Sequence, residues 1–168
     1  MGIFSGSRPV NLGYATGKFA PPSWKPNTVS STVEPSDKHY IEPLPFTGTA
    51  STAWKRLRVI VASSKGAATL SESGTYLYAE FCSGLFGFVD DVEFAIDEKT
   101  GVIHARSSSR LGIDDLGANR KRIERIRQEL LESSIREALN FVLRQQRHAH
   151  QCHRDNHGLP VRIEKRFR

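Results

Sequence analysis

The chain has 168 residues, of which 38% are apolar and 25% charged, and this composition is that of an ordinary globular protein with one core. Two cysteines are too few for a disulfide framework, and the N-terminus lacks a charged segment followed by a long apolar run. No stretch of about 20 apolar residues is present that would cross a bilayer. We therefore expect a soluble, cytoplasmic protein.

The formal net charge is +6, and it is unevenly distributed along the chain. Residues 1–116 hold 11 Lys and Arg against 12 Asp and Glu, a net charge of −1, whereas residues 117–168 hold 13 against 6, a net charge of +7. A basic last third would attract an acidic partner surface, nucleic acid or anionic lipid. A solvated helix face explains the same charge equally well, because charge alone carries no selectivity.

Residues 1–48 are rich in Gly, Pro, Ser and Thr and carry seven of the eight prolines, which predicts an extended arm with turns. Apolar residues recur in it too often for a free linker, so we expect the arm to pack on the core. A helix is expected from Thr49 to about Ser63, with Thr49 as its N-cap and Gly66 just past its end.

Strands are predicted next. Residues 75–82 alternate in the manner of a half-buried strand, and residues 67–71 are a weaker candidate before them. Residues 88–97 and 102–109 flank a four-residue link that is typical of a hairpin. Pairing Ile96 with Ile103 places the apolar residues on one face and is the favoured register, although a slip by one residue stays open.

From Gly117 the apolar spacing becomes helical and continues to about Arg147. The order of elements predicts an α+β fold, an antiparallel sheet of about four strands with an N-terminal and a long C-terminal helix on one face. We divide the chain into the arm (1–48), a single α+β domain (49–140) and a basic, His-rich extension (141–168).

The stretch Arg106–Arg127 is the densest in polar chemistry, with three serines, two aspartates, two glycines and seven basic residues around one strand-to-helix turn. Helix N-terminal amides, hydroxyls and guanidinium groups together suit a phosphate, sulfate or carboxylate. The candidate anion-binding residues are Ser107, Ser108, Ser109, Arg110, Asn119, Arg120 and Arg122.

An internal charge network without a ligand is the alternative interpretation of the same stretch. Asp114 and Asp115 would cap the helix and neutralise its arginines. Strand alternation also puts Asp90 on an apolar face, where a carboxylate must be paired with Arg106, Arg110 or Arg120, protonated or bound to a cation. The candidate network residues are Asp90, Asp91, Glu93, Arg106, Asp114 and Asp115.

Metal sites are weaker alternatives. The carboxylates at 90–93 and 114–115 could hold Mg²⁺ or Ca²⁺. The weak zinc candidates are His148, His150, Cys152 and His153, whose spacing matches no structural zinc pattern. No phosphate loop, dinucleotide glycine pattern or nucleophile elbow is present, so we expect neither a metal nor another cofactor.

Four segments resemble one known family: PNTVSS at 26–31, IEPLPF at 41–46, FVDDVEF at 88–94 and the stretch at 106–127. The family is Domain of Unknown Function 1499, and the N-terminal MGIFSG resembles the start of its short bacterial members. The resemblance covers roughly residues 1–130. In that family a cysteine usually stands on each side of a Pro-Asn step, whereas this chain has Pro22 and Thr28 there. The resemblance implies no activity.

Three functions are compatible with the sequence. The favoured one is a non-enzymatic module whose Ser/Arg turn binds an anionic group of a small molecule, lipid or acidic partner surface. The second is a metal-dependent hydrolase using Asp90, Asp91 and Glu93 for acid–base chemistry. The third is nucleic-acid binding by the basic C-terminal helix, which is not expected because glutamates interleave with its arginines.

Overall fold

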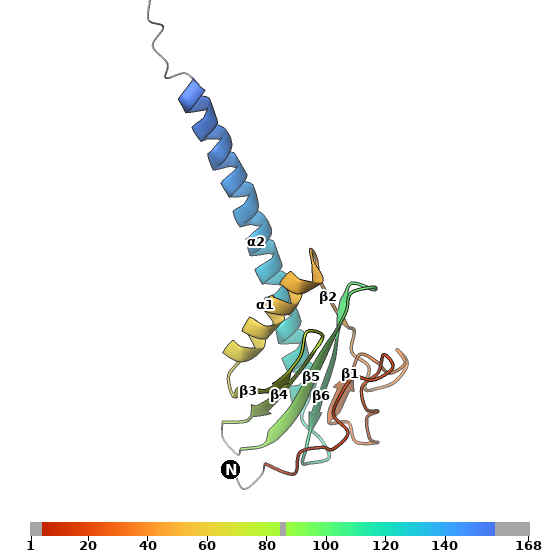
Figure 1. Cartoon of the computed structure of the whole chain (residues 1–168). Coiled ribbons are helices and arrows are strands. Elements are labelled where there is room, and N and C mark those ends of the chain that lie inside the picture. The colour runs from red at the N-terminus through yellow and green to blue at the C-terminus, as the bar shows by residue number, and fades with distance from the viewer. Residues whose placement is uncertain (1–4, 85–86, 157–168) are drawn as a thin grey trace, which may run out of the picture. The chain divides into compact units, whose positions relative to one another are not determined.

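A computed structural model describes residues 5–84 and 87–156, with side chains described as far as residue 147. The chain divides into two compact units, Met1–Glu132 and Ser133–Arg168. The first unit contains the sheet, helix α1 and the first part of helix α2 (Figure 1). The candidate residues between positions 90 and 122 all lie in this first unit.

The first unit is built on a six-stranded antiparallel sheet in the order β1-β6-β5-β4-β3, with β2 also paired to β6 (Figure 1). The strands are β1 (Thr28–Ser30), β2 (Leu44–Pro45), β3 (Ala67–Glu72), β4 (Tyr76–Cys82), β5 (Val89–Asp97) and β6 (Val102–Ser109). The predicted α+β class is confirmed, but the strand count of four was too low. The two extra strands come from the proline-rich segment and are too short to show alternation.

The β5–β6 hairpin has the favoured register, with Ile96 opposite Ile103 and Glu93 opposite Arg106. Strand β5 is central and is buried at every position before Asp97. Such burial means that both faces of the sheet are covered, unlike the half-exposed sheet that alternation alone implies. Charged side chains on β5 therefore lie inside the molecule and need partners.

The helices cover one face of the sheet. Helix α1 (Ala50–Ser63) begins at Thr49, whose Oγ1 accepts a hydrogen bond of 3.2 Å from the backbone N–H of Thr52. Its buried residues are Ala53, Trp54, Leu57, Ile60 and Val61. Gly66 follows the helix at φ +76°, and a Cβ there would lie 2.3 Å from the carbonyl oxygen of Cys82. The chain can turn directly from α1 into β3 only because this residue is glycine.

Helix α2 (Ala118–Asn156) starts where the spacing predicts and ends later than the predicted Arg147. No proline or glycine occurs between Arg147 and Asn156, so the sequence has no signal that stops a helix there. In the first unit, α2 contributes Ile123, Ile126 and Leu130 to the same core as α1 and the sheet. In the second unit, the side chains of Ile135, Leu139 and Val142 are exposed.

The opposite face of the sheet is covered by the N-terminal segment. The backbone N–H of Gly13 donates to Glu93 on β5, and the ring of Tyr14 stacks on His104 of β6 at 5.9 Å between centroids. Phe19 is buried as well. These contacts place polar groups of β5 and β6 between the sheet and the segment before β1.

Candidate functional site

Asp91 and Arg110 form the first of three buried charge clusters. The Arg110 Nη2 donates 2.7 Å to Asp91 Oδ1 and 3.1 Å to the hydroxyl of Tyr78, and it also pairs with Glu80. Hydrogen bonding to Asp91 raises the pKa of Arg110, against the opposing effect of burial. Burial would raise the pKa of Glu80, but hydrogen bonds from Arg110 and Arg8 hold it below its usual value. The guanidinium group of Arg110 is thus already paired with side chains of the protein.

Glu93 and Arg106 form the second cluster, at the middle of the sheet. Glu93 is fully buried. Its Oε2 accepts a hydrogen bond of 2.8 Å from Arg106 Nη1. Its Oε1 accepts hydrogen bonds of 2.6 Å from the Gly13 N–H and 2.8 Å from the Tyr76 hydroxyl. Burial, with the charge of Glu93, raises the pKa of Tyr76, so the phenol stays a donor. Among the described residues, the buried Nε of Arg106 has no hydrogen-bond partner.

Asp90 belongs to the third cluster, on the face beneath α2. Its carboxylate pairs with Arg122, and not with the expected Arg106, Arg110 or Arg120. The reason is the strand alternation, which directs the side chain of Asp90 toward α2 and those of Asp91 and Glu93 toward the other face of the sheet. Arg122 Nη1 also donates 2.7 Å to Asn119 Oδ1 and 2.9 Å to Ser107 Oγ.

Asn119 ties this third cluster together. Its side chain is fully buried, accepts from Ser107 and Arg122, and donates 3.0 Å to the carbonyl oxygen of Asn27 and 2.8 Å to Ser109 Oγ. All of the hydrogen-bonding groups of the amide are therefore used. The sequence predicts Asn119 as an anion ligand. In the structure its hydrogen bonds instead join β6, α2 and the segment before β1.

The two remaining anion-binding candidates also have partners in the protein. The hydroxyl of Ser108 lies 2.7 Å from that of Thr28 on β1. Arg120 Nη2 donates 2.7 Å to the carbonyl oxygen of Tyr40 and 3.3 Å to that of Lys38.

Asp114 and Asp115 cap backbone amides at the start of α2. Asp114 Oδ1 accepts 2.7 Å from the Leu116 N–H, and Asp115 accepts 3.0 Å from the Gly117 N–H and 2.7 Å from the Asn119 N–H. The expected capping is present. Over residues 5–84 and 87–147, neither aspartate forms an ion pair with an arginine, because the nearby arginines reach instead toward β5 and the segment before β2.

The acidic residues do not converge on a cation. Asp90 lies on one face of the sheet, whereas Asp91 and Glu93 lie on the other, and each has an arginine partner. Within the described residues, no group of three or more His, Cys, Asp or Glu side chains is arranged to hold a metal ion. The weak zinc candidates, His148, His150, Cys152 and His153, have side chains outside the described set.

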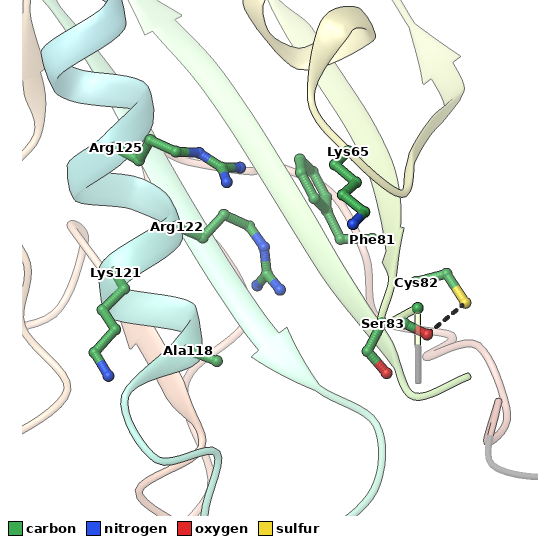
Figure 2. Close-up of a pocket in the computed structure, with 9 residues that line it drawn as sticks. Lys65, Phe81, Cys82, Ser83, Ala118, Lys121, Arg122 and Arg125 are labelled. Carbon is green, nitrogen blue, oxygen red and sulfur yellow. Dashed lines mark hydrogen bonds between the residues drawn. The ribbon is translucent and has the colours of Figure 1, made fainter. Parts of the chain in front are cut away.

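A pocket of about 470 Å³ lies between the first turns of α2 and the end of β4 (Figure 2). Its lining residues are Lys65, Phe81, Cys82, Ser83, Gly84, Ala118, Lys121, Arg122 and Arg125. Four of them are cationic and none is acidic. We call this the cationic pocket.

The cations of the pocket differ in how firmly they are held. Lys65 has no hydrogen bond or ion pair with any described residue. Arg125 has one exposed ion pair, 3.6 Å long, with Glu129, and such pairs contribute little. Arg122 is fixed by its third-cluster partners. Figure 2 shows Arg122 and Arg125 extending from α2 into the space beside Lys65 and Phe81, with Lys121 directed away from them.

Only one residue of the pocket, Arg122, was among the candidates from sequence. Arg125 follows at i+3, which places it on the same helix face, and this spacing could have found it. Lys65 could not be identified from sequence, because only the antiparallel pairing of β3 with β4 brings it close to Cys82. The N–H of Cys82 donates a hydrogen bond of 2.8 Å to the carbonyl oxygen of Gly66, the residue next to Lys65.

The fold and its three arginine–carboxylate clusters define a small α+β domain with both sheet faces covered. The chain belongs to the family described as Protein of unknown function (DUF1499), whose profile matches residues 18–130. The match includes the arginine–carboxylate pairs that define the three clusters, and the cationic pocket, but begins later than the residue 1 start that the resemblance implied. No curated protein and no solved structure matches the chain. Among the described helices, none has the length and apolarity needed to cross a membrane.

Proposed function

We propose that this protein is a non-enzymatic binding module whose cationic pocket takes an anionic group, a phosphate or a carboxylate, of a small molecule. The observation that carries the proposal is the meeting of Lys65, Arg122 and Arg125 in one pocket that has no acidic residue among its described lining residues. Their known counter-charges are Asp90 on Arg122 and the exposed Glu129 on Arg125. Lys65 adds a positive charge that no described side chain balances.

The proposal moves the anion site from the serine-rich turn to the side of α2. Ser107, Asn119 and Arg110 are occupied by other protein groups, so they support the neighbouring charges and do not contact the ligand. Arginine forks recognise tetrahedral and planar oxyanions through paired hydrogen bonds, whereas lysine contributes a point charge. Arg125 and Lys65 are free to adjust to the anion, and Arg122 provides a fixed wall.

The other two functions have less support. The hydrolase alternative needs Asp90, Asp91 and Glu93 near one another, but they point to opposite faces and each faces an arginine. The nucleic-acid alternative rests on the basic charge of the last third alone, which carries no selectivity. We retain a cytoplasmic location as part of the proposal.

Isothermal titration with inorganic phosphate at low chloride tests the proposal. We expect saturable binding that weakens as chloride is raised, because exposed charges are screened. The double variant Lys65→Gln/Arg125→Gln should weaken binding by about tenfold or more, equivalent to about 1.4 kcal/mol. Both side chains are exposed and outside the buried clusters, so folding should be retained.

The matched control is Arg136→Gln/Arg144→Gln, which removes the same charge from exposed positions of α2 beyond the first unit. It should bind phosphate as the parent protein does. Equal losses in both double variants would mean that only net charge matters, and would overturn a site at the pocket, as would absence of saturable binding.

A further inference from the structure

A second cavity, of about 350 Å³, adjoins the cationic pocket. The two share the lining residues Ser83 and Ala118. The lining of this second cavity, which we call the apolar groove, is Ser83, Phe88, Val89, Asp90, Ser109, Leu111, Gly112, Asp114, Asp115, Leu116 and Ala118. Its large apolar side chains are partly or largely exposed: Phe88 by 39%, Leu111 by 39% and Leu116 by 85%.

The three aspartates of the groove are already engaged by protein groups. Asp90 pairs with Arg122, Asp114 accepts from the Leu116 N–H, and Asp115 accepts from two amides at the start of α2. Arg122 offsets the charge of Asp90, and the backbone amides satisfy and orient the carboxylates of Asp114 and Asp115. An apolar chain in the groove would contact Phe88, Leu111 and Leu116 without uncovering an unpaired carboxylate.

Leu116 is an unusual choice for its position. Its φ is +53°, a left-handed conformation that strains a leucine and that glycine or asparagine adopts at lower cost. Leu116 is 85% exposed, so packing within the described protein offsets little of the energy of this backbone conformation. Its side chain therefore offers apolar surface to something other than the core.

We infer that the ligand is a monomeric single-chain amphiphile with an anionic head, bound with the head in the cationic pocket and the chain along the apolar groove. The inference rests on the proposed function of the cationic pocket and adds the chemical class of its ligand. Charge complementarity fixes the direction of the amphiphile, because cations line one cavity and apolar side chains rim the other. The two cavities adjoin at Ser83 and Ala118, which line both, so an amphiphile with its head in one and its chain in the other would pass these two residues.

The chain-length dependence of affinity tests the inference. The probes are inorganic phosphate and ethyl, butyl, hexyl and octyl phosphate, each titrated below its micelle concentration, with 1-octanol as the uncharged control. Affinity should increase along the alkyl series by up to about fourfold per added methylene, the fold-change that corresponds to about 0.8 kcal/mol per buried CH₂. Octanol should bind much more weakly than octyl phosphate.

Leu116→Asn is the decisive variant, since asparagine keeps the left-handed backbone and removes the apolar contact. It should reduce octyl phosphate affinity severalfold and leave inorganic phosphate affinity unchanged. Val59→Gln, which replaces an exposed apolar residue of α1 outside both cavities, should change neither.

The outcomes separate this inference from the proposed function. Phosphate binding with no gain along the alkyl series would overturn the amphiphile and leave the anion site standing. No binding of phosphate or of any alkyl phosphate would overturn both. Octanol binding as tightly as octyl phosphate, or binding to anionic phospholipid vesicles without binding of the monomers, would also overturn the inference.

Discussion

The guanidinium carbon of Arg122 lies 4.8 Å from the centroid of the Phe81 ring, while the same group pairs with Asp90. A cation stacked on an aromatic face and held by a carboxylate loses little further freedom when a ligand arrives. Arg122 therefore joins the third cluster, which stabilises the fold, to the cationic pocket, where we place the ligand.

Asn119→Ala should be among the most destabilising substitutions in this chain. It removes a fully buried amide and its four hydrogen bonds to Ser107, Arg122, Asn27 and Ser109. Arg122 and the Asn27 carbonyl keep other partners, but four hydrogen bonds at about 0.5–1.5 kcal/mol each give an expected loss of about 3 kcal/mol or more in the free energy of unfolding, measured by urea denaturation.

Gln128→Ala is the matched control on an exposed position of α2, and it should change the free energy of unfolding by no more than about 0.5 kcal/mol. A small effect of Asn119→Ala, similar to that of the control, would show that the amide does not tie β6 to α2 as described.

The Glu93–Arg106 pair predicts a strong coupling between its two residues. Arg106→Met leaves a buried carboxylate without its cation and should cost about 3–5 kcal/mol. Glu93→Gln/Arg106→Met should cost less than Arg106→Met alone, since the neutral glutamine can still accept from the Gly13 N–H and the Tyr76 hydroxyl. A double-mutant cycle by chemical denaturation measures this coupling, and additive effects would contradict it.

Arg120 and Arg127 join α2 to the segment before β2. Arg120 donates to the carbonyl oxygens of Lys38 and Tyr40, and Arg127 to those of Glu42 and Pro43, the last at 2.7 Å. Replacing both arginines by alanine should free residues 35–43 for proteolysis at protease concentrations that leave the parent protein intact.

Arg125→Ala is the control for that experiment, because Arg125 lies on the same helix and makes no contact with that segment among the described residues. Cleavage sites are identified by mass spectrometry. Cleavage of both variants at equal rates, or cleavage spread evenly over the first unit, would contradict a specific role of the two arginines.

The pH dependence of stability should report on His104. Burial lowers the pKa of His104, with a smaller opposing effect of Asp97. The unfolded chain then takes up the proton first, near pH 6.5, so the contribution of neutral His104 to stability is complete above about pH 6.5 and is lost as the pH falls toward the lowered pKa.

His104→Gln should therefore lose less stability than the parent protein between pH 7 and 5, as measured by thermal unfolding in buffers of constant ionic strength. The ring contacts Ser31 and Tyr14, so the absolute stability of the variant will also fall, and the slope with pH is the quantity to compare. An unchanged slope would exclude His104 as its source.

Sequence patterns predicted the elements that repeat over many residues. The alternation in β5 and β6 gave the register that puts Glu93 opposite Arg106, and the spacing of Ile123, Ile126 and Leu130 gave the buried face of α2. Both features follow from the period of the backbone itself. The class of the fold followed from the order of these elements.

Partner choice could not be predicted in the same way. Asp90 pairs with Arg122 because α2 crosses the face of β5 that carries Asp90. Where two elements far apart in the chain cross cannot be predicted from sequence patterns. The same holds for the burial of Asp91 and Glu93, since the segment before β1 covers a face that alternation would leave in water. Lys65 reached the cationic pocket only through the β3–β4 pairing.

The arginine side-chain Nε–H signals, followed by NMR during a titration with inorganic phosphate, test the central claim most directly. We predict saturable shifts of the Arg122 and Arg125 signals at a common affinity, with Arg106 and Arg110 unmoved because their partners are within the protein. Saturable shifts at Arg110 or Arg120 with none at Arg125 would place the anion at the serine-rich turn instead and contradict the cationic pocket as its site.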